Sequence, residues 1–159
     1  MPPTVALIYD FDGTLAPGNM QEFGLLQSFG YNDPNEFWTL CDQIAKTNDA
    51  GGIAVVMYAI QAEAQRAGLR CTRDLLRSFG KDVQFFPGVE QWFEHINAYA
   101  KEIGVNVKHY INSSGIKEMV EGCAIANNFE NIYACTYLYD SNGDACWPAV
   151  VVDYTKKTQ

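Results

Sequence analysis

The stretch VALIYDFDGTL, from Val5 to Leu15, decides the fold that we predict for this chain. Its apolar beginning is typical of a buried parallel strand, and the carboxyl end of such a strand is where open α/β sheets place their chemistry. Asp10 and Asp12 follow at that end, and Gly13 is expected to let the chain turn and bring the second carboxylate over the first. Such a pair suits a metal-assisted reaction in which one carboxylate attacks and the other moves a proton.

The DFDGT string after a hydrophobic strand resembles the first motif of the haloacid dehalogenase-like (HAD) superfamily, most of whose members are Mg²⁺-dependent phosphohydrolases and phosphotransferases. The resemblance implies that Asp10 is the nucleophile that becomes an aspartyl phosphate, and that Asp12 is the general acid and base. Asp10 would also bind Mg²⁺ through its carboxylate, and Asp12 through its backbone carbonyl. Gly13 and Thr14 are assigned to substrate binding in the same loop. The alternative is that these residues merely end a strand in a turn.

The second motif of the family is a Ser or Thr at the end of the next strand, and the segment VNVKHYINSSG at 105–115 supplies two candidates. Apolar residues recur at helical spacing over 116–124, so the serines lie where a strand leads into a helix. We favour Ser114 as the phosphate ligand and assign Ser113 and Gly115 to substrate binding, because hydroxyl, backbone amides and helix dipole would converge on one anion. The alternative is that a serine only caps the helix.

The third motif is a lysine that offsets the charge of the carboxylates and of the phosphoryl group. The segment DYTKKTQ near the carboxyl end offers Lys156 and Lys157. The lysine of similar family members opens a helix after a Thr-rich turn, which favours Lys157. An ordinary solvated lysine pair is the alternative.

The fourth motif, another acidic pair after a further strand, is absent from these 159 residues. Asp10 and Asp12 therefore supply only part of an octahedral Mg²⁺ shell, and Asp140, Asp144 and Asp153 are the next candidates for ligands. We expect the chain to be the amino-terminal part of a longer enzyme or a truncated gene product. In the family's sheet order the first strand is central, so it would become an exposed apolar edge that is open to self-association.

Composition narrows the class of partner. The net charge of −8 and the pI near 4.6, with no basic cluster, argue against nucleic acid or an anionic membrane. No apolar stretch is long enough to span a bilayer, and the amino terminus lacks a basic leader. Five cysteines without a CxxC pair indicate reduced thiols. We therefore expect a cytoplasmic protein with a small phosphorylated substrate.

The rest of the chain predicts an α/β fold, a Rossmann-like three-layer parallel sheet that is incomplete at the carboxyl end. Residues 1–16 and 87–159 would form this core, and residues 17–86 a helical cap. The expected elements are helices at 36–45, 52–67, 72–79 and from 89 to about 104, a strand at 132–136 and a small hairpin around 142–143. The aromatic residues of the cap, Trp38 among them, are interpreted as its hydrophobic core.

The function expected from these motifs is that of a Mg²⁺-dependent phosphatase, acting on a small phosphorylated metabolite through an aspartyl phosphate. Two alternatives stay open. A phosphotransferase or mutase of the same family would use the same Asp10. A non-catalytic phosphate-binding or interaction module would explain the incomplete metal site. The sequence names no substrate, because specificity lies mostly in the variable cap.

Overall fold

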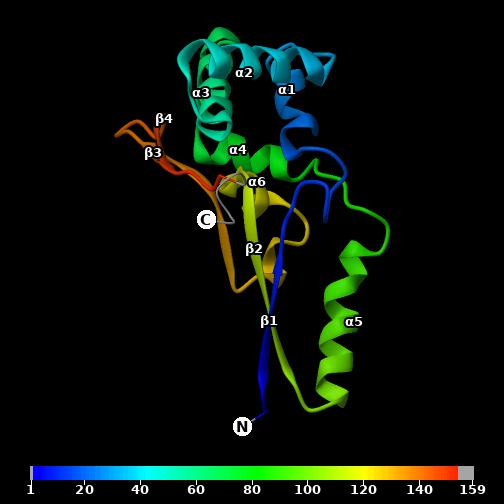
Figure 1. The fold of residues 1–159 in the computed structure, drawn as a ribbon. Helices are drawn as coiled ribbons and strands as arrows, with labels where there is room; N and C mark the ends of the chain where they lie inside the picture. Colours follow the sequence, from blue (N-terminus) through cyan, green and yellow to red (C-terminus); the bar gives the residue numbers. More distant parts are fainter. Residues whose placement is uncertain (1, 154–159) are drawn as a thin grey trace.

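A mostly parallel sheet organises the protein in the computed structural model, which describes residues 2–153 (Figure 1). Its strands lie in the order β1 (Thr4–Tyr9), β2 (Asn106–Ile116), β3 (Asn131–Tyr139) and β4 (Ala145–Val150). The first three strands pair in parallel, and β4 pairs antiparallel with β3. The α/β class, the early strand and the hairpin around residues 142–143 are therefore confirmed.

The helices come between these strands in the sequence. A short η1 (Met20–Glu22) and α1 (Leu25–Ser28) follow β1, and then come α2 (Pro34–Asn48), α3 (Gly52–Arg66), α4 (Arg73–Gly80) and α5 (Val89–Glu102). Between β2 and β3 lie α6 (Lys117–Gly122) and η2 (Ala126–Asn128). Figure 1 shows α2 and α3 above the carboxyl ends of β1 and β2, with α5 alongside the strands. The predicted helices are thus confirmed to within a few residues at their ends.

Local sequence signals explain where the helices begin. Asp33 caps α2 by accepting a hydrogen bond from the N–H of Asn35, and Pro34 occupies the first helical position. Thr72 caps α4 in the same way by accepting from the N–H of Leu75. Each cap satisfies a backbone N–H that has no partner within the helix.

Two glycines bring α4 and α6 into contact through their backbones. A Cβ atom on Gly80 would lie 2.1 Å from the carbonyl oxygen of Met119, and one on Gly122 would lie 2.0 Å from that of Arg77. No side chain larger than hydrogen fits at either position. The Arg77 guanidinium also bonds to the Glu121 carboxylate at 2.6 Å, on the exposed side of this contact.

β1 lies at the edge of the sheet, and among the described residues it pairs only with β2. Two of its apolar side chains are largely exposed, Val5 at 44% and Ile8 at 66%. An apolar edge strand of this kind is a surface on which another chain can pair. Self-association through it stays a prediction.

All five cysteines are free, and only Cys146 is exposed. Within residues 2–153, no helix combines the length and the apolar character that a membrane crossing needs.

We predict that Gly80→Ala and Gly122→Ala each lower the free energy of unfolding by about 1–3 kcal/mol, since the added methyl group must displace backbone. Gly52→Ala is the matched control, because a Cβ at Gly52 meets no atom within 4 Å. Denaturant unfolding of the three variants measures the difference. Equal stability of all three would contradict the backbone contact.

Candidate active site

A tight turn follows β1 and carries both predicted catalytic carboxylates. The carbonyl oxygen of Phe11 accepts hydrogen bonds from the N–H groups of Thr14, Leu15 and Ala16, at 2.9–3.2 Å. Gly13 has a φ of +72°, a backbone conformation that a residue with a Cβ rarely adopts. The turn that we predicted from the glycine is therefore present, and it reverses the chain directly after Asp12.

Asp12 is held inside the protein by the segment that follows the turn. Its Oδ1 accepts a hydrogen bond from the N–H of Met20 at 2.8 Å. Burial raises the pKa of Asp12 to about 7, the charges of Asp10 and Glu22 add to the rise, and the Met20 hydrogen bond opposes it. A carboxyl group with a pKa near neutrality can both give and take a proton, as general acid and base catalysis requires.

Asp10 lies at the carboxyl end of β1, and its side chain is exposed. Its Oδ1 accepts a hydrogen bond from the N–H of Phe11 at 3.0 Å. The Asp10 carboxylate is exposed to solvent, whereas the Asp12 carboxyl is partly buried and lines a cavity. Gly13 and Thr14, the other residues assigned from this motif, lie exposed in the turn.

The two serines of the second motif occupy different environments at the end of β2. Ser113 is 1% exposed, and its Oγ accepts a hydrogen bond from the N–H of Gly115 at 2.9 Å. Ser114 instead lines a cavity together with Asp12. A Cβ at Gly115 would lie 2.1 Å from Cε of Met20 and 3.2 Å from Oδ2 of Asp12. The glycine therefore allows the end of β2 to approach the turn after β1.

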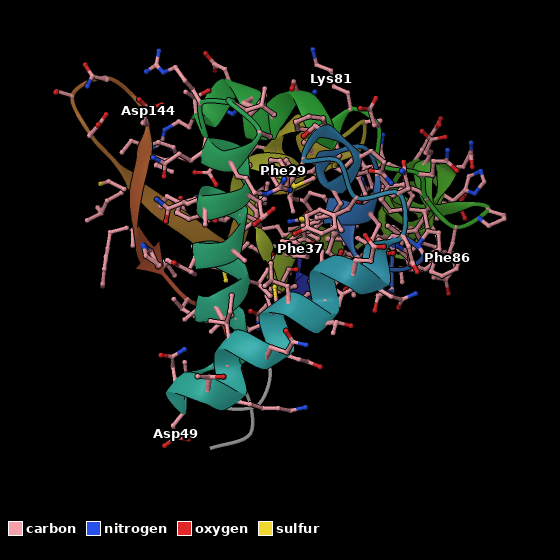
Figure 2. All side chains as sticks on the ribbon, turned by 90° about the horizontal axis from the view of Figure 1, so that it is seen from above. Phe29, Phe37, Asp49, Lys81, Phe86 and Asp144 are labelled. Carbon is pink, nitrogen blue, oxygen red and sulfur yellow. The ribbon has the colours of Figure 1, made fainter. Side chains whose placement is uncertain are left out.

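The cavity beside Asp12 and Ser114 has a volume of about 240 Å³, and two helices, α2 and α3, contribute to its lining. Residues from the turn region, from α2, from α3 and from the end of β2 line it: Asp12, Asn19, Gln21, Trp38, Cys41, Asp42, Gly52, Ile53, Val56 and Ser114. Figure 2 looks down on these helices, with Phe37 of α2 pointing inward and Asp49 at the far end of α2. Asp10, Gly13, Thr14 and the β3–β4 hairpin are not among the lining residues.

Sequence reasoning missed the contribution of α2 to this cavity. Trp38, Cys41 and Asp42 stand at positions i, i+3 and i+4, so they share one face of the helix. We interpreted Trp38 as part of the cap core, and its partly buried ring does pack against the core, but it also lines the cavity. The signal that could have found this face is Asp42, a charged side chain one turn after the tryptophan.

Glu22 holds two of the lining side chains in place. Its Oε1 accepts hydrogen bonds from Nε1 of Trp38 and from Nδ2 of Asn19, both at 2.8 Å. One carboxylate oxygen thus connects the turn region to the helix above it. Because both donors are engaged, the position of the Trp38 ring is fixed relative to the turn.

The structure describes some of the residues that the sequence suggested as metal ligands, but not the predicted lysine. Within residues 2–153, no group of three or more His, Cys, Asp and Glu side chains could hold a metal ion. Asp140 accepts from backbone N–H groups of the hairpin turn, and Asp144 pairs with Arg70 at 2.9 Å. Lys156 and Lys157 lie outside the described residues.

No protein-family model matches the chain. An uncharacterized protein of Borreliella burgdorferi is 28% identical to it over an alignment of 144 residues, gaps included, and the match covers 84% of this chain and 50% of that protein. The chain therefore spans about half the length of the curated relative that it matches.

Solved structures of HAD hydrolases share the fold. A phosphoserine phosphohydrolase-like protein from Francisella tularensis superposes with a TM-score of 0.57 at 19% identity, over 93% of this chain and 64% of that one. A HAD family hydrolase from Salmonella enterica serovar Typhi gives 0.54 at 16% identity, over 91% and 45%. Phosphoserine phosphatase, solved as a phospho-aspartyl intermediate analogue, gives 0.52 at 13% identity, over 90% and 61%. The resemblance that DFDGT predicted is confirmed as a shared fold.

We predict that Asp12→Asn stabilises the metal-free protein more at pH 8 than at pH 5. The folded Asp12 keeps its proton up to a pKa of about 7, whereas the unfolded residue loses it near pH 4. Stability is therefore lost as the pH rises through this window, and the uncharged asparagine removes the loss. The gain in unfolding free energy should grow by about 2–3 kcal/mol between the two pH values. Denaturant unfolding in a chelating buffer measures it, and a gain independent of pH would contradict the burial of the charge.

Proposed function

We propose that the cavity beside Asp12 is the active site of a phosphatase that works through an aspartyl phosphate on Asp10. One observation carries the proposal: a partly buried carboxyl group with a pKa of about 7 lines a cavity with Ser114, two residues after an exposed carboxylate at the end of a parallel strand. The fold shared with HAD hydrolases supports it. The cavity volume of about 240 Å³ suits a small phosphorylated metabolite.

The first step transfers the phosphoryl group to the protein. A carboxylate oxygen of Asp10 attacks phosphorus in line, and the bond from phosphorus to the ester oxygen breaks. Asp12 gives its proton to that oxygen, so that the leaving group departs as a neutral alcohol. The Ser114 hydroxyl donates a hydrogen bond to a phosphoryl oxygen while negative charge shifts during transfer.

The second step regenerates the enzyme. Asp12, now ionised, takes a proton from a water molecule, and the oxygen of that water attacks the phosphorus of the aspartyl phosphate. Inorganic phosphate leaves, Asp10 is again a carboxylate and Asp12 again carries a proton. The helical cap of residues 17–86 would keep bulk water away during the first step.

Asp10 and Asp12 offer the type of ligand atom that a hard cation prefers, but too few of them to complete its coordination shell. The carboxylate of Asp10 and the backbone carbonyl of Asp12 are oxygen donors of the kind that Mg²⁺ takes, and they would supply part of its shell. When bound, Mg²⁺ would offset the repulsion between the Asp10 carboxylate and the phosphoryl oxygens. We expect Lys157 to add a further positive charge.

A phosphate-binding module without turnover is the second candidate. It is favoured by the metal ligands that are missing at this site, since no group of three or more His, Cys, Asp and Glu side chains among the described residues could hold a metal ion. A phosphotransferase would form the same aspartyl phosphate and pass it to a hydroxyl group. Release of inorganic phosphate from p-nitrophenyl phosphate at millimolar Mg²⁺ separates hydrolysis from both.

We predict that Asp10→Asn abolishes this turnover and leaves the melting temperature close to that of the wild type, because an amide cannot form the acyl phosphate. Asp12→Asn should slow turnover by about 10²–10⁴-fold, with phosphorylated protein accumulating. Phosphoprotein trapped with labelled substrate, followed by mass spectrometry, checks the second outcome. Substantial residual turnover in Asp10→Asn would rule out the nucleophile.

The two serines should respond differently to substitution by alanine. Ser114→Ala should weaken competitive inhibition by phosphate or vanadate, because the hydroxyl that lines the cavity is lost. Ser113→Ala should leave inhibition unchanged and lower stability by about 1 kcal/mol, since the N–H of Gly115 loses its buried acceptor. If inhibition weakens equally in both variants, the assignment of Ser114 fails.

A further inference from the structure

The charges that line the cavity have one sign. Asp42 contributes a carboxylate, Asp12 contributes the carboxyl group that carries the proton in the proposed first step, and no Lys, Arg or His occurs among the described residues that line the cavity. Asp42 belongs to α2, whereas Asp12 and Ser114 belong to the turn after β1 and to the end of β2, so the Asp42 carboxylate comes from a different wall of the cavity. A ligand group near Asp42 is therefore attracted if it is positive and repelled if it is negative.

Gln21 presents a buried acceptor that the protein itself leaves unused. Its side chain lines the same cavity and is 4% exposed. The carbonyl oxygen Oε1 has no hydrogen-bond partner among the described residues. A buried polar atom without a partner is destabilising, and such exceptions in folded proteins call for a specific explanation. A ligand donor reaches this oxygen only if the Gln21 side chain turns toward the cavity, and the hydrogen bond then removes the penalty.

Trp38, which lies on α2 like Asp42, gives the cavity an aromatic surface. Its N–H is already bonded to Glu22, so the indole offers ring carbon atoms to the cavity and no donor. An indole attracts cations more strongly than any other aromatic side chain. The Glu22 carboxylate behind the ring adds a further negative charge to this side of the cavity.

Building on the proposed phosphatase function, we propose that the leaving group of the substrate is a small alcohol that carries a protonated amino group. The phosphoryl group would lie at Asp10 and Ser114, and the ammonium group would lie beside Asp42 and donate a hydrogen bond to Oε1 of Gln21. A leaving group with a carboxylate or a second phosphate would find no positive side chain among the described lining residues. A phosphorylated amino acid such as phosphoserine satisfies the acceptors but leaves its carboxylate unpaired.

Three esters of nearly equal size test the charge of the leaving group. They are 2-aminoethyl phosphate, propyl phosphate and 2-carboxyethyl phosphate, which differ by one unit of charge at each step. At millimolar Mg²⁺ we expect kcat/KM to fall in that order, by at least about tenfold from the first to the last, the effect of roughly 1.4 kcal/mol of differential interaction. An equal or reversed order would overturn the proposal.

Asp42→Asn identifies the group that recognises the ammonium. Asp42 is exposed, so the substitution should not disturb folding. The ratio of kcat/KM for the aminoethyl ester to that for the propyl ester should fall about threefold, as expected for an exposed ion pair. The matched control is Asp49→Asn, at the far end of α2 (Figure 2), where asparagine also tolerates the left-handed backbone conformation. The ratio should be unchanged there, and equal effects of both variants would overturn the role of Asp42.

Binding separates this inference from the phosphatase proposal. The indole N–H signal of Trp38, identified by its loss in Trp38→Phe, reports occupancy of the cavity in NMR titrations with the same three esters. Tightest binding of the aminoethyl ester without any turnover would support the inference while the phosphatase proposal fails. Turnover of p-nitrophenyl phosphate without preference among the esters would do the reverse. Failure of the aminoethyl ester to bind would overturn the inference in either case.

Discussion

The hydrogen bond from the N–H of Met20 to the Asp12 carboxylate is the interaction on which the rest of the site depends. It closes the turn after β1 and places the fully buried Met20 side chain between that turn and the end of β2. The sulfur of Met20 accepts from the N–H of Ile116 at 3.3 Å, and Gly115 leaves room for its methyl group. A motif near the amino terminus and a serine about a hundred residues later are thus held together through one side chain.

The core of the fold could be predicted because its signals are local. The apolar run before Asp10, the punctuation around residues 142–143 and the periodicity of α2, α3 and α5 each depend on neighbours in the chain. The contact of Gly80 with Gly122 and the placement of Trp38 depend on how distant helices pack. No local pattern distinguishes an aromatic residue that fills a core from one that lines a cavity, so this part of the site required the structure.

Two residues that line the cavity bury polar groups in an unusual way. The Asp12 carboxyl is partly buried, which raises its pKa, and the Gln21 side-chain carbonyl has no hydrogen-bond partner in the described residues. Proteins break local rules of this kind mainly where function requires it. Oε2 of Glu118 is also buried and unpartnered there, but Oε1 of the same residue accepts from Thr136 and Tyr139, and Glu118 does not line the cavity. Gln21 combines an unpartnered buried atom with a position beside the cavity, and Glu118 does not, so Gln21 is the better candidate for a ligand contact.

The glycine contact between α4 and α6 makes one side of the cavity more rigid than the other. Backbones that touch without side chains cannot slide past one another by changing rotamers, so α4 is coupled rigidly to the helix that follows Ser114. We therefore expect the part of the cavity wall that contains Asp12 and Ser114 to be rigid. We expect any widening of the cavity to require movement of α2 and α3, and a movement of α2 away from the turn would break the hydrogen bond from Trp38 to Glu22. Asp42 of α2, which would contact the leaving group, then moves with its helix, while Gln21, next to Met20, and the groups that would contact phosphorus stay with the sheet.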